Sequence, residues 1–474
     1  MLNFNYLLFS DAAKFADIAR NLLINGKPET TFNFWGGNNL LSMKYLTSYL
    51  MVIFFKVFGI NDFAVVITSF FYFLLSLIFV YLLAQKIYKN KLTSILATVA
   101  VGFNYNLINY ATSGASESPF IFEILAGTYF LSLKKWWGNV LGVIFMILMY
   151  FTRPQAIIYI FGLILYFFIN NFSWKKGLIY TFVSFVIGTI FYALFSKQGL
   201  IAVTQNLPGM AVSDSLRGGT VDFNLIVLIK KVFYNLYNFY KALPEIINPY
   251  LFTLFLIGII KKNTAFKTSV LFMFLATLFI TALTIPFYRY IHPVVPLIYI
   301  VAVGTLMEII DKFKVQNPKF KMGIATGLVM FFAVGQTLGI LFLDSRFEKK
   351  LKNIGKAPIY VEMSYKLKEI TDKDDVIVTN LDTWGSWYGE RKTIWFPLEP
   401  SMLENAGDEI DAIYLTSYKI DDQNYYMGKN WRILFDNPQN QVILSDFKFA
   451  GEYRFNALEN FDNEEARAIL FVRK

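Results

Sequence analysis

The sequence contains no cysteine and only one histidine, His292. Without cysteine the chain forms no disulfide and offers neither a thiolate nucleophile nor a zinc–thiolate site. A single histidine also excludes a metal site built from several imidazoles. Charged residues are scarce as well, at 16% of the chain, which argues against an ordinary water-soluble protein. Any catalytic chemistry must therefore use carboxylates, amines, guanidinium groups or hydroxyls.

Hydrophobic residues are abundant, at 55% of 474 residues, and include 50 Phe and 29 Tyr. This composition indicates a polytopic α-helical membrane protein. The formal net charge of +10 is explained by basic loops at the cytoplasmic surface of a membrane, so we expect no nucleic-acid partner.

Ten apolar runs are long enough, or nearly so, to cross a bilayer, which predicts about ten spans. They lie at 63–84, 92–109, 119–133, 138–152, 154–170, 178–196, 246–260, 267–287, 291–309 and 322–343.

The charges of the connecting loops orient these spans. Loops 85–91, 134–135, 174–176, 261–267 and 311–321 are rich in lysine, whereas loop 104–118 has no basic residue and loop 288–292 has one arginine. Because lysine and arginine favour the cytoplasmic side, the lysine-rich loops are expected inside the cell. The alternate loops and all residues after Leu343 are then expected outside.

The N-terminal sixty residues are expected on the outer face too. The run 40–58 is interrupted by Lys44 and Lys56, which favours an interfacial helix over a span. With no transmembrane segment ahead of residues 1–40, the chain is expected to begin one helix late. A second outer segment, 197–243, ends in an amphipathic helix over 225–243 that could cover a site.

Residues 344–474 differ sharply in composition and predict an extracytoplasmic α/β domain, so that the expected domains are 1–343 and 344–474. A helix is expected over 360–370. The expected strands lie at 376–378, 393–396, 412–415, 442–444 and 469–472.

A short amphipathic helix over 10–22 carries the first candidate residue, Asp11. Phe15, Ile18, Ala19 and Leu22 fall on one face of this helix, and Asp11 lies in its first turn. Two readings stay open, because Asp11 is either an N-cap or a functional acid at the outer surface.

The other ionisable residues expected near the outer boundary offer three further candidates. Glu117 opens a span after a loop of small residues, and Arg153 and Arg289 stand at outer helix ends, against the usual charge bias. Structural roles as a helix-terminal acid, a snorkelling cation and an aromatic-belt anchor stay open for them. The full set is Asp11, Asp17, Lys44, Glu117, Arg153, Asp214, Arg217, Asp222, Arg289 and His292.

The order of these features resembles the C-type (GT-C fold) membrane glycosyltransferases, and among them prokaryotic relatives of dolichyl-phosphate-mannose protein mannosyltransferases and lipid A aminoarabinose transferases. The resemblance covers most of the chain. It departs from the family pattern where the first transmembrane helix is missing, where Lys44 lacks a following proline, and where the second acid is a lone Glu117. The matching pieces are Asp11 to Leu22, Tyr45 to Gly59, Glu117-Ser118-Pro119, Thr152-Arg153-Pro154, Arg289-Tyr290 before Pro293, and Trp387 to Arg391.

This resemblance implies transfer of a hexose or pentose from a polyprenyl-phosphate donor, with inversion, to a hydroxyl of a lipid, glycan or protein acceptor on the outer face of the cell membrane. Asp11 would be the general base. Arg153, Arg289, Tyr290 and Lys44 would bind the lipid phosphate. Glu117 would orient the acceptor or offer an oxygen ligand to a divalent cation such as Mg²⁺ or Mn²⁺.

Two other classes of protein remain as alternatives. A transporter or lipid flippase predicts charges at the bilayer midplane and two similar halves, and neither is visible in the sequence. A non-catalytic scaffold predicts no functional cluster among the candidate residues.

Overall fold

A computed structural model describes residues 6–7, 9–35, 45–195, 217–218, 224–261, 264–283, 287–312, 318–343, 357–405, 409–417, 428–439, 444–455 and 466–474. The chain divides into two compact units. The sheet unit comprises Met1–Val65, Ile201–Phe223 and Glu348–Lys474, and the helix-bundle unit comprises Val66–Leu200 and Asn224–Phe347. Lys44, Asp214 and Asp222 lie outside the described residues.

The described residues of the ten apolar runs are mainly helical, which confirms a mainly helical membrane body. The bundle helices are α3 (Asp62–Tyr88), α4 (Lys91–Gly102), α5 (Tyr105–Ala111), α6 (Glu117–Ser132), α7 (Trp136–Thr152), α8 (Ala156–Asn171), α9 (Trp174–Phe195), α12 (Leu225–Ile246), α13 (Pro249–Lys261), α14 (Ala265–Leu283), η1 (Tyr288–Tyr290), η2 (His292–Val294), α15 (Val295–Lys312) and α16 (Pro318–Leu343).

One expected span, 92–109, is two helices. Helix α4 ends at Gly102, and Asn104 caps α5, because its side chain accepts a hydrogen bond from the Leu107 N–H at 3.1 Å. Its amide group also donates to the Tyr299 hydroxyl at 3.0 Å, which secures the break against α15. Among the described residues, four helices are long and apolar enough to cross a membrane, or five if the bent pair α12 and α13 is one span. The number of spans stays a prediction.

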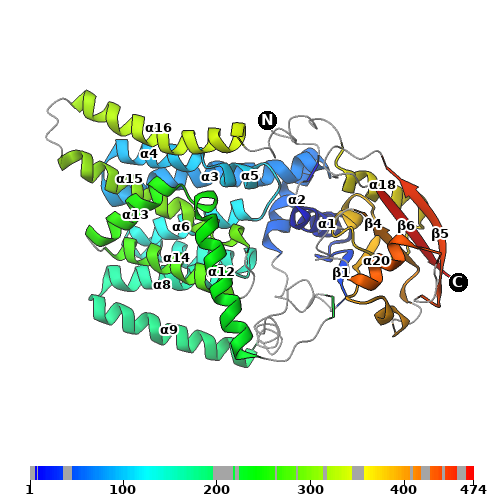
Figure 1. Cartoon of the computed structure of the whole chain (residues 1–474). Coiled ribbons are helices and arrows are strands. Elements are labelled where there is room, and N and C mark those ends of the chain that lie inside the picture. The colour runs from blue at the N-terminus through cyan, green and yellow to red at the C-terminus, as the bar shows by residue number, and fades with distance from the viewer. Residues whose placement is uncertain are drawn as a thin grey trace. The chain divides into compact units, whose positions relative to one another are not determined.

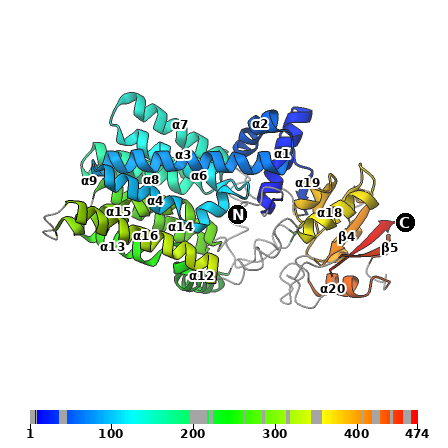
Figure 2. The same ribbon diagram turned by 90° about the horizontal axis from the view of Figure 1, so that it is seen from above.

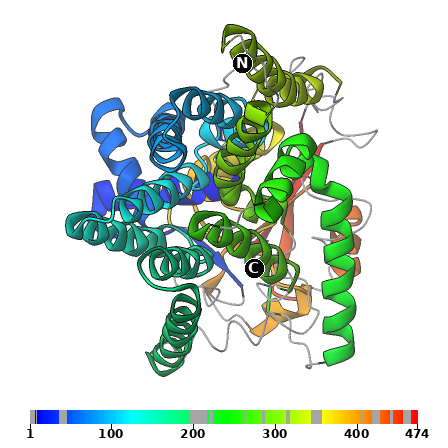
Figure 3. The same cartoon turned by 90° about the vertical axis from the view of Figure 1, so that its left-hand side faces the viewer.

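The core of the bundle unit is α15. Nearly every side chain from Val295 to Met307 is buried, including the fully enclosed Tyr299. Helix α13 approaches α15 closely at Gly258, where an added Cβ would lie 2.1 Å from the Thr305 hydroxyl oxygen. Small residues permit such close helix packing in membranes. Figure 2 shows α7 at one margin of the bundle, and α9 lies at another margin in Figures 1 and 3.

The sheet unit combines both ends of the described chain. Its six strands have the order β1-β3-β2-β4-β6-β5. The pairings among β1, β3, β2 and β4 are parallel, and the pairings of β6 with β4 and with β5 are antiparallel. The strands are β1 (Phe32–Phe34), β2 (Val376–Thr379), β3 (Lys392–Trp395), β4 (Ala412–Thr416), β5 (Phe447–Arg454) and β6 (Arg467–Arg473). Figure 1 shows β1, in the blue of the N-terminal segment, beside elements coloured yellow to red.

The helices of the sheet unit also come from both ends of the chain. They are α1 (Ser10–Asn25), α2 (Leu46–Phe58), α18 (Ile359–Ile370), α19 (Trp384–Trp387), η3 (Pro400–Asn405) and α20 (Lys429–Asp436). The expected α/β part at the C-terminus is thus present. The compact unit differs from the expected domain 344–474, because residues 1–65 and 201–223 belong to it as well.

Four of the five expected strands are present, and the fifth, 442–444, falls largely outside the described residues. Two strands were not expected. They are β5, which pairs with β6, and β1, which pairs in parallel with β3. The ring of Phe32 joins β1 to the core of the sheet and is completely buried.

Replacing Phe32 by Leu should lower the free energy of unfolding by about 1 to 2 kcal/mol, because a buried ring is exchanged for a smaller side chain. Thermal unfolding of the purified full chain, followed by tryptophan fluorescence, measures this loss. Lys392→Ala is the matched control, because Lys392 is exposed on the neighbouring strand. Equal stability of both variants would contradict the placement of β1 in the sheet.

Candidate functional site

Helix α1 presents Asp11 in its first turn. The residue at the N-cap position is Phe9, whose side chain makes no capping hydrogen bond. The reading of Asp11 as an N-cap is therefore wrong. The Asp11 side chain is partly buried.

The start of α1 is held by side chains from the C-terminal part of the sheet unit. The Leu7 carbonyl accepts hydrogen bonds from the Tyr360 hydroxyl at 2.8 Å and from the Trp384 indole at 3.2 Å. The Leu7 N–H donates to the Tyr388 hydroxyl oxygen at 2.8 Å, and the Thr383 hydroxyl donates to the Ser10 carbonyl. Asp11 thus stands on a backbone that four side chains fix.

Lys14, one turn along α1, provides the electrostatic environment of Asp11. Burial lowers the pKa of the Lys14 ammonium, and the nearby carboxylates of Asp11 and Asp382 oppose that shift. The ammonium also lies 4.6 Å from the centroid of the Phe34 ring. Lys14 is thus a cation shared between a carboxylate of α1 and one from the C-terminal part of the chain.

Asp17 and Arg217, two other candidates, have structural roles. Asp17 is fully buried, forms a 2.6 Å ion pair with Arg20 and accepts a hydrogen bond from the Thr31 N–H at 2.7 Å. Arg217 is also buried, and its guanidinium donates to the carbonyl oxygens of Phe396 and Pro397 at 3.1 and 2.9 Å.

In the bundle unit the structure brings Glu117 and Arg153 together. An Arg153 Nη atom lies 2.7 Å from a carboxylate oxygen of Glu117 and 2.8 Å from the Ser116 hydroxyl. The side chains of Glu117 and Arg153 are only 2% and 7% exposed, so the ion pair is almost completely removed from water. The Glu117 carboxylate therefore holds the Arg153 guanidinium in position through this ion pair.

Two guanidinium groups flank the ring of Tyr290. The Arg153 group lies 5.6 Å from the ring centroid and the Arg289 group lies 5.5 Å from it, both within the range of cation–π attraction. Arg289 is only partly buried. Tyr290 therefore links the buried Arg153, which is paired with Glu117, to the more accessible Arg289.

Tyr110 and His292 complete this cluster, and we identify their pairing only from the structure. The Tyr110 hydroxyl forms a hydrogen bond with Nδ1 of His292. Burial and the charge of Glu117 raise the pKa of Tyr110, and Arg289 and Arg153 oppose the shift. The phenol is therefore a neutral hydrogen-bonding group close to all three charges. A sequence signal existed only for His292, which precedes Pro293.

A divalent cation does not fit the donors present in the described part of the chain. No three His, Asp or Glu side chains gather there. Glu117 faces a guanidinium group, and Glu123, on the same helix, accepts a hydrogen bond from the Thr152 hydroxyl at 2.7 Å. The expected cation role of Glu117 thus finds no companion ligands among these residues.

Known proteins resemble this chain at two levels. A family model matches a segment of the sequence, and solved structures match the whole fold. Residues 45–198 match the family model described as dolichyl-phosphate-mannose-protein mannosyltransferase. Crystal structures of ArnT from Cupriavidus metallidurans, in the apo state and bound to undecaprenyl phosphate, superpose with TM-scores of 0.51 and 0.52 at 10% identity. Each covers 99% of this chain, and the chain covers 94% and 95% of them. The chain thus shares the fold of these ArnT structures.

A curated relative from Aquifex aeolicus (strain VF5), described as an uncharacterized protein, is 27% identical over 166 residues. The match spans 34% of this chain and 29% of that protein. Of the GT-C candidate residues, Glu117 and Arg153 lie within the segment that matches the mannosyltransferase model, whereas Asp11, Arg289 and Tyr290 lie outside it.

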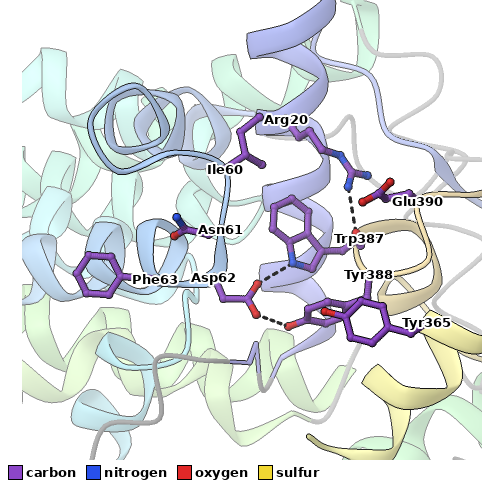
Figure 4. Close-up of a pocket in the computed structure, with 9 residues that line it drawn as sticks. All are labelled: Arg20, Ile60, Asn61, Asp62, Phe63, Tyr365, Trp387, Tyr388 and Glu390. Atoms are coloured by element: carbon purple, nitrogen blue, oxygen red, sulfur yellow. Dashed lines mark hydrogen bonds between the residues drawn. The ribbon is translucent and has the colours of Figure 1, made fainter. Parts of the chain in front are cut away.

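The sheet unit also contains a cavity of about 590 Å³, lined in part by the segment from Trp387 to Arg391 that the sequence had singled out. Its walls come from α1, from the end of the α2–α3 connection with the first turn of α3, from α18, and from the end of α19 with the residues after it. Figure 4 shows the Asp62 carboxylate pointing toward Trp387 and Tyr388. Its two oxygens accept hydrogen bonds from the Trp387 indole at 2.8 Å and from the Tyr388 hydroxyl at 2.9 Å.

Proposed function

We propose that this protein transfers a sugar from a polyprenyl-phosphate donor to a hydroxyl of a lipid, glycan or protein acceptor. The observation that carries the proposal is the pair of arginines on Tyr290, within a membrane fold of the GT-C type. A lipid phosphate is an anion at the membrane boundary, and guanidinium groups bind phosphate strongly. A solved ArnT structure of the same fold contains undecaprenyl phosphate.

In the proposed reaction, the Asp11 carboxylate removes the proton of the acceptor hydroxyl as its oxygen attacks the anomeric carbon. The new carbon–oxygen bond forms while the bond to the phosphate oxygen breaks, which inverts the anomeric configuration. The polyprenyl phosphate leaves as an anion, and Arg153 and Arg289 stabilise its charge. Glu117 holds Arg153 in place, and Tyr290 supports both guanidinium groups. Lys44 remains a proposed further phosphate ligand, and no step uses a metal ion.

The proposal is tested by incubating membranes that contain the full chain with polyprenyl-phosphate sugars labelled in the sugar. We expect a hexosyl or pentosyl label to move from one lipid to an acceptor. A flippase would change the side of the labelled lipid and leave it intact, and a scaffold would do neither. Intact donor lipid after incubation with the whole panel would overturn the proposal.

We further propose that the site and the C-terminal part of the chain face the cell exterior. Because the chain lacks cysteine, single cysteines report their side of the membrane directly. An impermeant maleimide should label Lys448→Cys in intact cells and should label Lys176→Cys only after lysis. Both positions are exposed in the structure. The opposite labelling pattern would reverse the proposed orientation.

A further inference from the structure

The cavity in the sheet unit contains none of the residues that the proposed reaction uses. It is lined by charged and aromatic side chains from four separate segments, among them Arg20, Asp62, Tyr365, Trp387 and Glu390. At about 590 Å³ it lies within the usual size range of small-molecule sites.

The charges of the lining do not suit an anion. Arg20, its cation, already pairs with Asp17 at 2.6 Å and donates to the carbonyl oxygens of Ser386 and Trp387. Glu390 pairs with Lys368 at 2.8 Å. Within the described chain, Asp62 forms no ion pair, since the hydrogen-bond donors to both its oxygens are neutral. A phosphate placed here would face the carboxylates of Asp62 and Glu390, and the charge of Arg20 is already compensated by Asp17, although not all its N–H groups are used.

A hydroxyl-rich ligand suits the same lining. Each hydroxyl of a sugar both donates and accepts a hydrogen bond, so it can donate to the Asp62 or Glu390 carboxylate and accept from Arg20 or Asn61. A ligand carrying one ammonium group would use only the acidic part of this set and would meet Arg20.

Among the aromatic residues of the lining, Tyr365 is the most exposed. Trp387 is covered, because Phe55 stacks with it at 6.2 Å and the Arg20 guanidinium lies 5.0 Å from its ring centroid. Tyr365 is 52% exposed and meets Tyr388 only in an edge-to-face contact at 6.0 Å. The free face of Tyr365 can therefore contact the apolar C–H face of a sugar ring.

The rim of the cavity is apolar on the side where α3 begins. Ile60 and Phe63 line the cavity and are 39% and 40% exposed. Ile60 precedes α3 by two residues and Phe63 lies in its first turn, and α3 is the most hydropathic of the candidate spans in the described chain. A headgroup in the cavity would thus have its lipid chains beside exposed apolar residues.

We propose that this cavity binds the saccharide headgroup of a membrane glycolipid, which is the acceptor of the transfer reaction. The acceptor role rests on the proposed function, whereas the binding itself does not. The choice of acceptor would then depend on the first turn of α3, on Tyr365 and on Arg20.

Native mass spectrometry of the purified full chain, exchanged with equal amounts of monoglucosyl diacylglycerol, phosphatidylglycerol and phosphatidylethanolamine, tests this proposal. We expect preferential retention of the glucosyl lipid, and Tyr365→Ala should weaken it about fivefold, as expected for one aromatic contact. Glu369→Gln is the matched control, because Glu369 is 68% exposed on the same helix and does not line the cavity.

The other outcomes are equally decisive. If methyl glucoside is retained as strongly as the glycolipid, the cavity binds soluble saccharides, and the proposal of a membrane glycolipid is overturned. Preference for phosphatidylethanolamine that Asp62→Asn removes, preference for phosphatidylglycerol, or equal retention by Tyr365→Ala and Glu369→Gln would overturn the proposal. Failure of the proposed transfer reaction is separate, because it appears as intact donor while glycolipid retention persists.

Discussion

Replacing Asp11 by Asn should lower the rate of sugar transfer by roughly 100-fold or more while the protein remains folded. The substitution keeps the shape of the side chain and removes its ability to take a proton. A loss of capping cannot explain such a result, because Phe9 stands at the N-cap position and Asn caps a helix about as well as Asp. Turnover of donor per folded molecule is the measurement, with thermal unfolding as the check on folding.

Asp17→Asn provides a matched comparison on the same helix. Asp17 is fully buried and accepts hydrogen bonds from Arg20, Thr30 and Thr31. Its replacement should lower the free energy of unfolding by about 2 kcal/mol, within the range for hydrogen bonds to charged groups. Turnover per folded molecule should change far less than in Asp11→Asn. If Asp11→Asn instead transfers sugar at a near-normal rate, Asp11 is not the base and Glu117 becomes the next residue to test.

Much of the fold could be predicted from the sequence because its signals are local. Apolar runs of bilayer length and short alternating segments predicted the bundle helices and most strands without any knowledge of packing. The break at Asn104 could not be predicted in this way, because the apolar run continues through it. It depends on a cap to Leu107 and on a contact with Tyr299 that is distant in sequence.

The composition of the sheet unit was the main feature that the sequence did not indicate. Strand β1 has only three residues, and its register pairs Phe32 with Thr393, so a long-range contact defines it. The hydrogen bonds that Leu7 forms with Tyr360, Trp384 and Tyr388 likewise join residues far apart in the sequence, so they could not be predicted from it. The N-terminal helix and the C-terminal part of the chain therefore form one structure that carries Asp11.

For the candidate site, the sequence identified residue types but not their pairing. Glu117, Arg153 and Arg289 were selected because charges are unexpected at outer helix ends. Nothing in the sequence indicated that Glu117 would neutralise Arg153. The two residues are 36 positions apart, and their contact arises only when the two helices pack. That pairing makes the two arginines unequal, because Arg153 is buried in an ion pair whereas Arg289 is only partly buried on an aromatic ring.

Arg153→Gln and Arg289→Gln should consequently differ in stability and agree in donor binding. Loss of Arg153 leaves the buried Glu117 carboxylate without its cation, and breaking such a pair typically costs about 3 to 5 kcal/mol. Arg289→Gln should unfold near the wild-type temperature. Each variant should bind a polyprenyl phosphate about 1.5 to 3 kcal/mol more weakly, because a hydrogen bond to a charged group is lost.

A Glu117→Gln, Arg153→Gln double variant separates the two effects of Arg153. Because the uncompensated carboxylate is then removed too, the double variant should recover much of the stability that Arg153→Gln loses. Its affinity for polyprenyl phosphate should stay as weak as that of Arg153→Gln, since the guanidinium group is still missing. Thermal unfolding and equilibrium binding of undecaprenyl phosphate, measured on the same purified samples, give both quantities. Recovery of donor affinity together with stability would show that Arg153 supports the fold alone, and the phosphate site would then have to rest on Arg289.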